Sequence, residues 1–154
     1  MSFKISGLPL AEFKPLFALS NAELEALHMV RRIADRSGFP CRVSLQDAEV
    51  GECLLLLNYE HLSVASPYRS RHAIFVRENA IEARPAANVV PELFRTRLLS
   101  VRAFDDKGMM TAADVVEGRE VEPLIDRMLV DQNVAYLHVH YAKPGCFAAR
   151  VDRC

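Results

Sequence analysis

Several short segments of this chain carry alternating or continuous apolar and β-branched residues, a pattern that predicts strands. Strands are expected over residues 3–8, 52–59, 73–77, 97–105 and 109–116. Another begins at Tyr136 and runs into Lys143-Pro144-Gly145, where proline and glycine favour a tight turn. Strand signals therefore outnumber helix signals.

Two segments have helical spacing. Ser20 and Glu23 form a capping box that predicts a helix through about Ala34, with a buried stripe of Leu24, Leu27, Val30 and Ile33. Pro123 opens a second helix, whose inward residues are Leu124, Ile125, Met128 and Leu129. No regular strand–helix–strand alternation is present, so we expect an α+β fold with a mainly antiparallel sheet and two or three packed helices. Residues 1–154 fit a single domain.

The charge balance limits the classes of partner. The chain has 19 basic and 20 acidic residues and a formal net charge of −1, so we expect no nucleic-acid partner. Its longest aliphatic run, residues 53–57, is too short to span a bilayer, and the first residues lack the apolar stretch of a secretory signal. We therefore expect a cytoplasmic protein without a membrane partner. Its four cysteines have no Cys-x-x-Cys spacing and are expected to be thiols.

The predicted strand that starts at Tyr136 carries His138 and His140. Residues two apart on a strand share one face and lie about 6.6 Å apart along it, so both imidazoles could bind one divalent metal ion or one anion. Apolar residues on both faces also suit a central strand covered on both sides, in which histidines are neutral core residues. The sequence leaves both interpretations open.

The turn after this strand determines where Cys146 lies. In a two-residue hairpin, Cys146 pairs with Lys143, and Ala149 pairs with His140. The thiol then shares the face that holds Leu137, Val139 and Tyr141, opposite the histidines. A metal site that uses Cys146 would require irregular backbone.

Residues 60–72 form a long polar connection, a kind of segment that is often functional. Arginine suits anion recognition because its planar guanidinium can bind a carboxylate or phosphate through two parallel hydrogen bonds. We expect a small acidic metabolite to be bound here by His61, Tyr68, Arg69 and Arg71. His61 could also complete a metal site with His138 and His140.

Cys41 and Cys146 are candidate catalytic nucleophiles. Such a thiol needs a base within hydrogen-bond reach, and the bases available to them are His61, His138 and His140. The chain has no nucleophile elbow, phosphate-binding loop or His-Glu-x-x-His motif. A thiol-dependent enzyme is therefore a third hypothesis.

Several segments together resemble an uncharacterised bacterial family, domain of unknown function 1203. They are FPCRVSL at 39–45, LLNYEH at 56–61, SPYRS at 66–70, IFVR at 74–77, and HVH at 138–140 with PGC at 144–146. The resemblance implies a stand-alone bacterial domain of this length and supplies no activity, ligand or catalytic residue. From the family resemblance we expect Gly-Pro before Ile74, but His72 and Ala73 stand there. This departure makes His72 a further candidate for a functional residue.

Two main functions follow from these patterns. The first is a small-molecule or anion site, with or without a metal ion, built from the histidine pair and the polar connection. The alternative is a non-catalytic homodimeric interaction protein in which the same polar groups only satisfy one another. Whether the protein is an enzyme is left open by the sequence.

Overall fold

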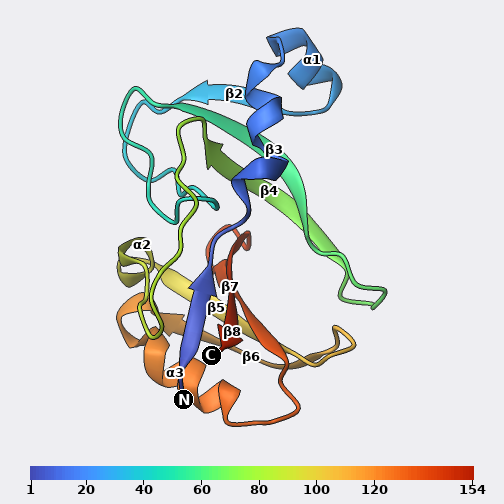
Figure 1. Ribbon diagram of the computed structural model, residues 1–154, viewed down its shortest axis with the longest axis vertical. Coiled ribbons are helices and arrows are strands. Elements are labelled where there is room, and N and C mark those ends of the chain that lie inside the picture. Colours follow the sequence, from blue (N-terminus) through green and yellow to red (C-terminus); the bar gives the residue numbers. More distant parts are fainter.

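The computed structural model describes residues 1–154, and its strands form two antiparallel sheets (Figure 1). The larger sheet has the order β1 (Phe3–Ser6), β8 (Phe147–Arg153), β7 (Tyr136–Tyr141), β5 (Leu98–Phe104) and β6 (Met110–Glu117). The smaller sheet has the order β2 (Val30–Ile33), β3 (Cys53–Leu62) and β4 (Ser70–Arg77). The mainly antiparallel sheet expected from the sequence is confirmed, although it is divided in two.

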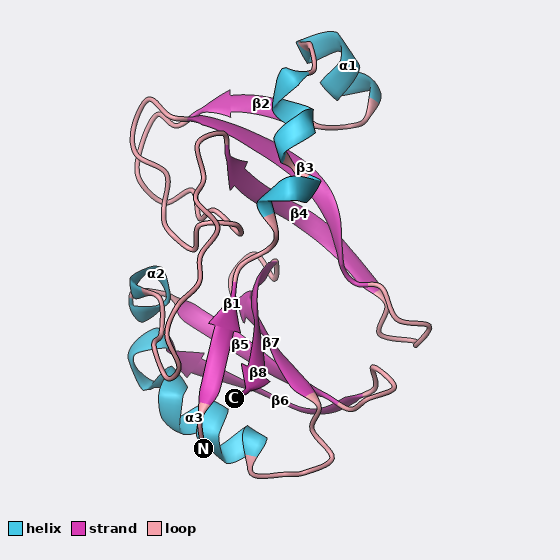
Figure 2. Ribbon diagram, viewed as in Figure 1, coloured by secondary structure: helices cyan, strands magenta, loops and turns pink.

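The helices are short and lie around the sheets, as Figure 2 shows. They are α1 (Asn21–Ala26), α2 (Glu92–Arg95) and α3 (Val121–Leu129), with 3-10 turns η1 (Leu10–Glu12), η2 (Lys14–Ala18) and η3 (Gly118–Glu120). The four inward residues predicted for the second helix are all buried in α3. None of these helices has the length and hydrophobicity that crossing a bilayer requires.

β7 is the central strand of the larger sheet, and all six of its residues are buried. On one face, Leu137 and Val139 join a core of 22 buried residues that includes the apolar side of α3. On the other face, His138 and His140 meet His61 at the end of β3, from the smaller sheet. The expectation of a strand covered on both sides is therefore confirmed.

The first predicted helix is shorter than its apolar spacing indicates. The Ser20 hydroxyl accepts the Glu23 N–H at 3.2 Å and the capping box is complete, but the helix ends at Ala26. His28 adopts a left-handed φ of 57°, and the chain then enters β2, which pairs with β3. The prediction that the helix continues to Ala34 is wrong. Val30 and Ile33 are β-branched, and their segment pairs with β3 as a strand although its apolar spacing is helical. Three members of its expected buried stripe are exposed, namely Leu27, Val30 and Ile33.

The polar connection predicted over residues 60–72 is also shorter. β3 extends to Leu62 and β4 begins at Ser70, so only residues 63–69 connect them. Leu62 is buried, which explains why the strand continues past the polar residues before it. His61 therefore lies on a strand and not on a flexible loop.

The register between β7 and β8 differs from the predicted one. His140 pairs with Phe147 and Val139 with Ala149, with an irregularity between them. Tyr141 donates its N–H to the Cys146 carbonyl at 3.0 Å, so the turn between these two residues is four residues long. The pairing of Ala149 with His140 is thus wrong, because the extra residue forms a bulge. The predicted face of Cys146 is nevertheless confirmed, since its side chain lies in the apolar core.

Candidate functional site

Three imidazoles come together where the two sheets meet: His61 from β3, and His138 and His140 from β7. We call these three residues the imidazole cluster. The ring centroid of His61 lies 6.0 Å from that of His138 and 5.0 Å from that of His140, and the two β7 rings are 6.2 Å apart. Phe147 stacks on His61 with 9° between the ring planes. The structure thus assembles the three histidines that the sequence proposes as one group.

Burial keeps these imidazoles neutral. His138 and His140 are 2% and 1% exposed. Burial is the main cause that lowers the pKa of His138 and His140 to about 3 and that of His61 to about 4, and the nearby Arg102 guanidinium contributes to all three shifts. A neutral imidazole can bind a metal ion or donate one hydrogen bond, but it does not attract an anion by charge.

The ring nitrogens of the cluster do not converge as metal ligands do. His140 Nδ1 lies 2.9 Å from the Gly145 carbonyl oxygen, so this nitrogen carries the proton and donates it. Nδ1 of His61 and Nδ1 of His138 are buried without a hydrogen-bond partner. The His61 ring packs edge-on against both others, and no group of three or more His, Cys, Asp or Glu side chains in the chain is placed to hold a metal ion.

The other residues expected to bind an anion remain near the surface. The Arg69 guanidinium pairs with the Glu60 carboxylate, and Arg71 is exposed. Tyr68 is 37% exposed and its ring lies 6.3 Å from that of Phe104. Of the four predicted ligand-binding residues, His61 is the one whose ring packs against the strand histidines. Of the two arginines expected to bind a ligand, Arg69 already has a carboxylate partner within the protein.

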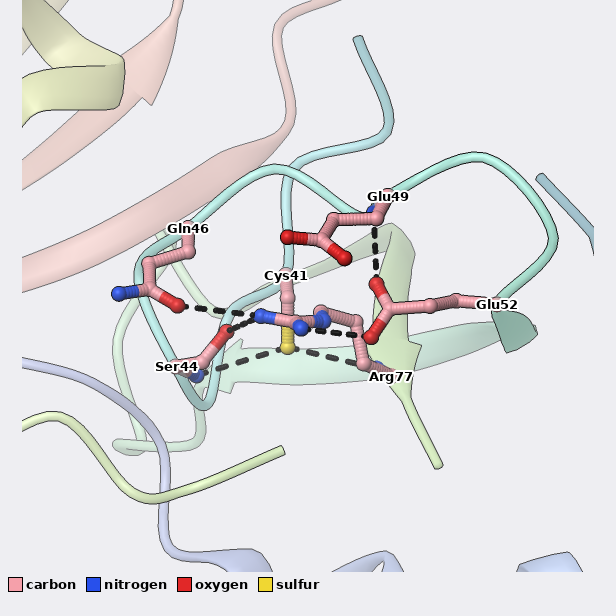
Figure 3. Close-up of polar contacts among 6 residues, drawn as sticks. All are labelled: Cys41, Ser44, Gln46, Glu49, Glu52 and Arg77. Atoms are coloured by element: carbon pink, nitrogen blue, oxygen red, sulfur yellow. Dashed lines mark hydrogen bonds and ion pairs between the residues drawn. The ribbon is translucent and has the colours of Figure 1, made fainter. Parts of the chain in front are cut away.

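Cys41 is fully buried inside a hydrogen-bonded network around Arg77 (Figure 3). Its Sγ accepts the backbone N–H groups of Ser44 at 3.5 Å and Arg77 at 3.3 Å. The Arg77 guanidinium lies above it and binds the Glu52 carboxylate at 2.6 Å, and the side chains of Ser44 and Gln46 as well. Neither Cys41 nor Cys146 forms a hydrogen bond with a histidine, so the thiol–imidazole pairs that the sequence proposes are not formed.

Arg42 is the functional candidate that sequence reasoning missed. It is only 1% exposed, and its guanidinium donates to the carbonyls of Pro40 at 2.6 Å and Phe147 at 2.8 Å and to Cys146 Sγ at 2.8 Å. Its backbone N–H binds Phe75 of β4, so this residue ties the smaller sheet to β8 of the larger one. The available signal was a lone arginine within the apolar segment at 39–45, but arginine is rarely buried without a carboxylate.

A cavity of about 380 Å³ opens beside this arginine, between the two sheets. We call it the inter-sheet pocket, and its polar wall consists of Arg42, His72, Thr96, Arg97, Tyr141, Lys143 and Cys146. Apolar side chains such as Leu56 and Phe75 line the rest, and no carboxylate is among the 14 lining residues. A larger, open hollow of about 780 Å³ beside Arg77 has both basic and acidic residues and therefore no such charge preference.

Two guanidinium groups of the pocket lie close to the ring of Tyr141. The Arg42 and Arg97 guanidinium carbons are 5.1 and 5.2 Å from its ring centroid. Burial raises the pKa of Tyr141 far above its ordinary value, against the opposing influence of both arginines, so the phenol stays neutral. Arg97 also binds Asp47 at 2.6 Å, but Asp47 does not line the pocket.

The comparisons with known proteins identify a family but no activity. A family model described as a protein of unknown function (DUF1203) matches residues 38–153. No curated protein and no solved structure matches the chain significantly. The matched region contains the whole imidazole cluster and the whole polar wall of the inter-sheet pocket.

Proposed function

This chain belongs to a family of proteins of unknown function (DUF1203), and from its geometry we propose that it binds a small organic anion in the inter-sheet pocket. The observation that carries the proposal is the charge of the lining, which includes Arg42, Arg97 and Lys143 but no carboxylate. A concave site with convergent cations and low-dielectric walls concentrates anions. The cavity volume of about 380 Å³ suits a small metabolite.

The lining also indicates what kind of anion fits. Lys143 is exposed on the β7–β8 turn and forms no ion pair within the chain, so its ammonium group can pair with a ligand. Leu56, Phe75 and Pro144 provide apolar surface beside the cations. An acid with a carbon skeleton would satisfy both surfaces, whereas a bare inorganic ion would leave the apolar side uncovered.

We assign the imidazole cluster a supporting role in this function. His140 donates a hydrogen bond to the carbonyl of Gly145, within the turn that carries Lys143 and Cys146. This contact fixes the direction in which the turn faces the pocket. The proposal requires no metal ion at the three histidines.

The proposal also includes the cellular compartment in which the protein acts. All four cysteines are free, which supports a reducing compartment, and we propose that the chain acts in the bacterial cytoplasm. The homodimeric interaction protein remains the alternative function. Light scattering in solution tests it, since a strictly monomeric protein would exclude it.

Isothermal titration calorimetry with succinate tests anion binding, with uncharged succinamide as the matched ligand. We expect succinate to bind and succinamide not to bind, with an affinity that weakens as salt is added. Lys143→Gln should weaken succinate binding by about two- to fivefold, the effect of removing one exposed charge. Lys107→Gln removes the same charge from the exposed turn between β5 and β6 and should have no effect. Equal heats for succinate and succinamide would overturn the proposal.

A further inference from the structure

Arg42 places an uncompensated positive charge in the protein interior. Its guanidinium stays protonated, and burying an unpaired charge costs several kcal/mol. The side chain is 1% exposed, and no carboxylate forms an ion pair with it. Its three hydrogen-bond acceptors are the carbonyls of Pro40 and Phe147 and the Sγ of Cys146. A negative charge on a group in contact with the guanidinium would offset this cost.

Only one of these groups can supply that charge. Backbone carbonyls do not ionise, and Tyr141, whose ring lies against the guanidinium, is kept neutral by burial. Cys146 Sγ, 2.8 Å from Nη2 of Arg42, is the ionisable group in direct hydrogen bond with the arginine. Adjacent cations favour the thiolate form of cysteine, which is the nucleophilic form.

The sulfur is also in a position to react. Cys146 lines the inter-sheet pocket, so a ligand held there lies beside the thiol. Cys41, which directly precedes Arg42 in the sequence, is 0% exposed and is hydrogen-bonded within the Arg77 network (Figure 3). Cys146 forms no hydrogen bond with a histidine, so chemistry that needs a general base at the sulfur is not supported.

We propose that Cys146 is a thiolate paired with Arg42 and that it exchanges with acidic low-molecular-weight disulfides bound in the inter-sheet pocket. Thiol–disulfide exchange needs an ionised thiol and no general base. The thiolate attacks one sulfur of the ligand, a Cys146–sulfur bond forms, and the ligand's sulfur–sulfur bond breaks. The other half leaves as a thiolate and takes a proton from water, so the bound disulfide is itself the oxidant: Cys146 is oxidised to a mixed disulfide and half of the ligand is reduced to a thiol. No second cysteine lines the pocket, so an external thiol must resolve the mixed disulfide.

This inference rests on the proposed function, because the cations of the pocket select the acidic disulfide. The test uses Cys154→Ser protein, which lacks the exposed terminal thiol, and three disulfides that differ in charge. These are oxidised glutathione, which is acidic, neutral 2-hydroxyethyl disulfide and cationic cystamine. Mass spectrometry follows the mixed disulfide at Cys146, and each rate is divided by the rate for the same protein unfolded in urea, which removes intrinsic differences among the reagents.

We expect the normalised rate for oxidised glutathione to exceed that for cystamine by about tenfold at low salt and to converge with it at high salt. Lys143→Gln should reduce this preference, and Lys107→Gln should leave it unchanged. The ultraviolet absorbance of the thiolate, measured as native protein minus Cys146→Ser, should be present at neutral pH. Equal rates for the three disulfides, or a native Cys146 that reacts no faster than in urea, would overturn the inference. If succinate still binds in that case, the anion pocket stands without a nucleophile, and if it does not, both proposals fail.

Discussion

His140 Nδ1 donates a hydrogen bond to the carbonyl oxygen of Gly145 over 2.9 Å and thereby ties β7 to the turn that follows it. Gly145 has a positive φ of 81°, which a side chain rarely tolerates and which lets the turn present its carbonyl to the imidazole. The next residue, Cys146, then points into the opposite face, toward Arg42. One neutral histidine thus links the imidazole cluster to the inter-sheet pocket.

His140→Ala should destabilise the protein by about 2–4 kcal/mol, because it leaves a cavity and removes the only side-chain donor to the Gly145 carbonyl. The free energy of unfolding in urea measures the loss. The matched control is His28→Asn, an exposed histidine in a left-handed conformation that asparagine tolerates, and it should change stability by less than about 0.5 kcal/mol. Similar losses for both variants would contradict a structural role for the imidazole.

The imidazole cluster should make the protein sensitive to mild acid. The ordinary histidine pKa is 6.5, and those of His138 and His140 are lowered to about 3 in the fold. Below pH 6.5 the unfolded chain therefore binds more protons than the folded one, and stability falls as the pH falls. Each buried histidine contributes a slope of up to about 1.4 kcal/mol per pH unit.

Urea unfolding between pH 6.5 and pH 5.5 isolates this effect, because the lower limit lies well above 4.5, the ordinary pKa of a glutamate carboxyl. The carboxyls of Glu52, Glu60 and Glu122 have pKa values lowered by their arginine partners, so they add to the loss only in stronger acid. His138→Ala should flatten the slope. A constant stability over this range would mean that the imidazoles accept protons within the fold.

The sequence predicted most of the strands and the two faces of β7, because both follow from the local pattern of apolar and β-branched side chains. His61 was also proposed as a possible partner of the β7 histidines, and the three rings lie close together, although the end of β3 that carries His61 was predicted to be a loop. The prediction for the first helix is wrong from His28 onward. His28 has a left-handed conformation and the next residues pair with β3, and both features depend on tertiary contacts. Local spacing does not contain that information.

The pocket could not be predicted because its wall comes from distant parts of the chain. Arg42 contacts Cys146 across 104 positions, Arg97 immediately precedes β5 of the larger sheet, and His72 lies on β4 of the smaller one. Counting charges along the sequence directed attention to Arg69, whose guanidinium pairs with its neighbour Glu60 across the β3–β4 turn. Burial, and not the number of arginines, distinguishes the arginine that borders a cavity.

The edge-on packing of the imidazole cluster predicts that removing metal ions will not change stability. Protein purified without chelators should show the same melting temperature before and after treatment with EDTA, and elemental analysis should find no near-stoichiometric transition metal. This measurement tests the metal site that the sequence suggested at His61, His138 and His140. A metal content near one per chain that is lost in a folded His138→Ala, His140→Ala variant would establish that site.

Cys41 should be inert in the folded protein. Its thiol is fully buried and accepts two backbone N–H groups, so alkylation requires local opening of the Arg77 network. With iodoacetamide, the exposed Cys154 should be modified early and Cys41 only on the timescale of unfolding. Peptide mapping after timed quenching measures each rate, and the same reagent in urea provides the fully accessible reference. Rapid native labelling of Cys41 would instead favour a catalytic role for it.

The charge pairing of Arg42 with Cys146 predicts that the two residues do not contribute independently to stability. Arg42→Met removes the buried cation together with its hydrogen bonds between the sheets and should cost about 2–4 kcal/mol. Cys146→Ala leaves the guanidinium without a negative partner, and once the guanidinium is gone this penalty disappears. The double variant should therefore be at least about 1 kcal/mol more stable than the sum of the single losses indicates.

A double-mutant cycle of urea unfolding energies at neutral pH measures this coupling, and the same cycle with Arg42→Met and Cys41→Ala supplies the comparison. Cys41 is next to Arg42 in sequence, but its thiol binds Ser44 and Arg77, so this second pair should be additive within about 0.5 kcal/mol. If the Arg42–Cys146 pair is additive as well, the guanidinium is stabilised by the two carbonyls alone and the thiol is neutral. A coupling found only for Cys146 identifies that sulfur as the partner of the buried charge.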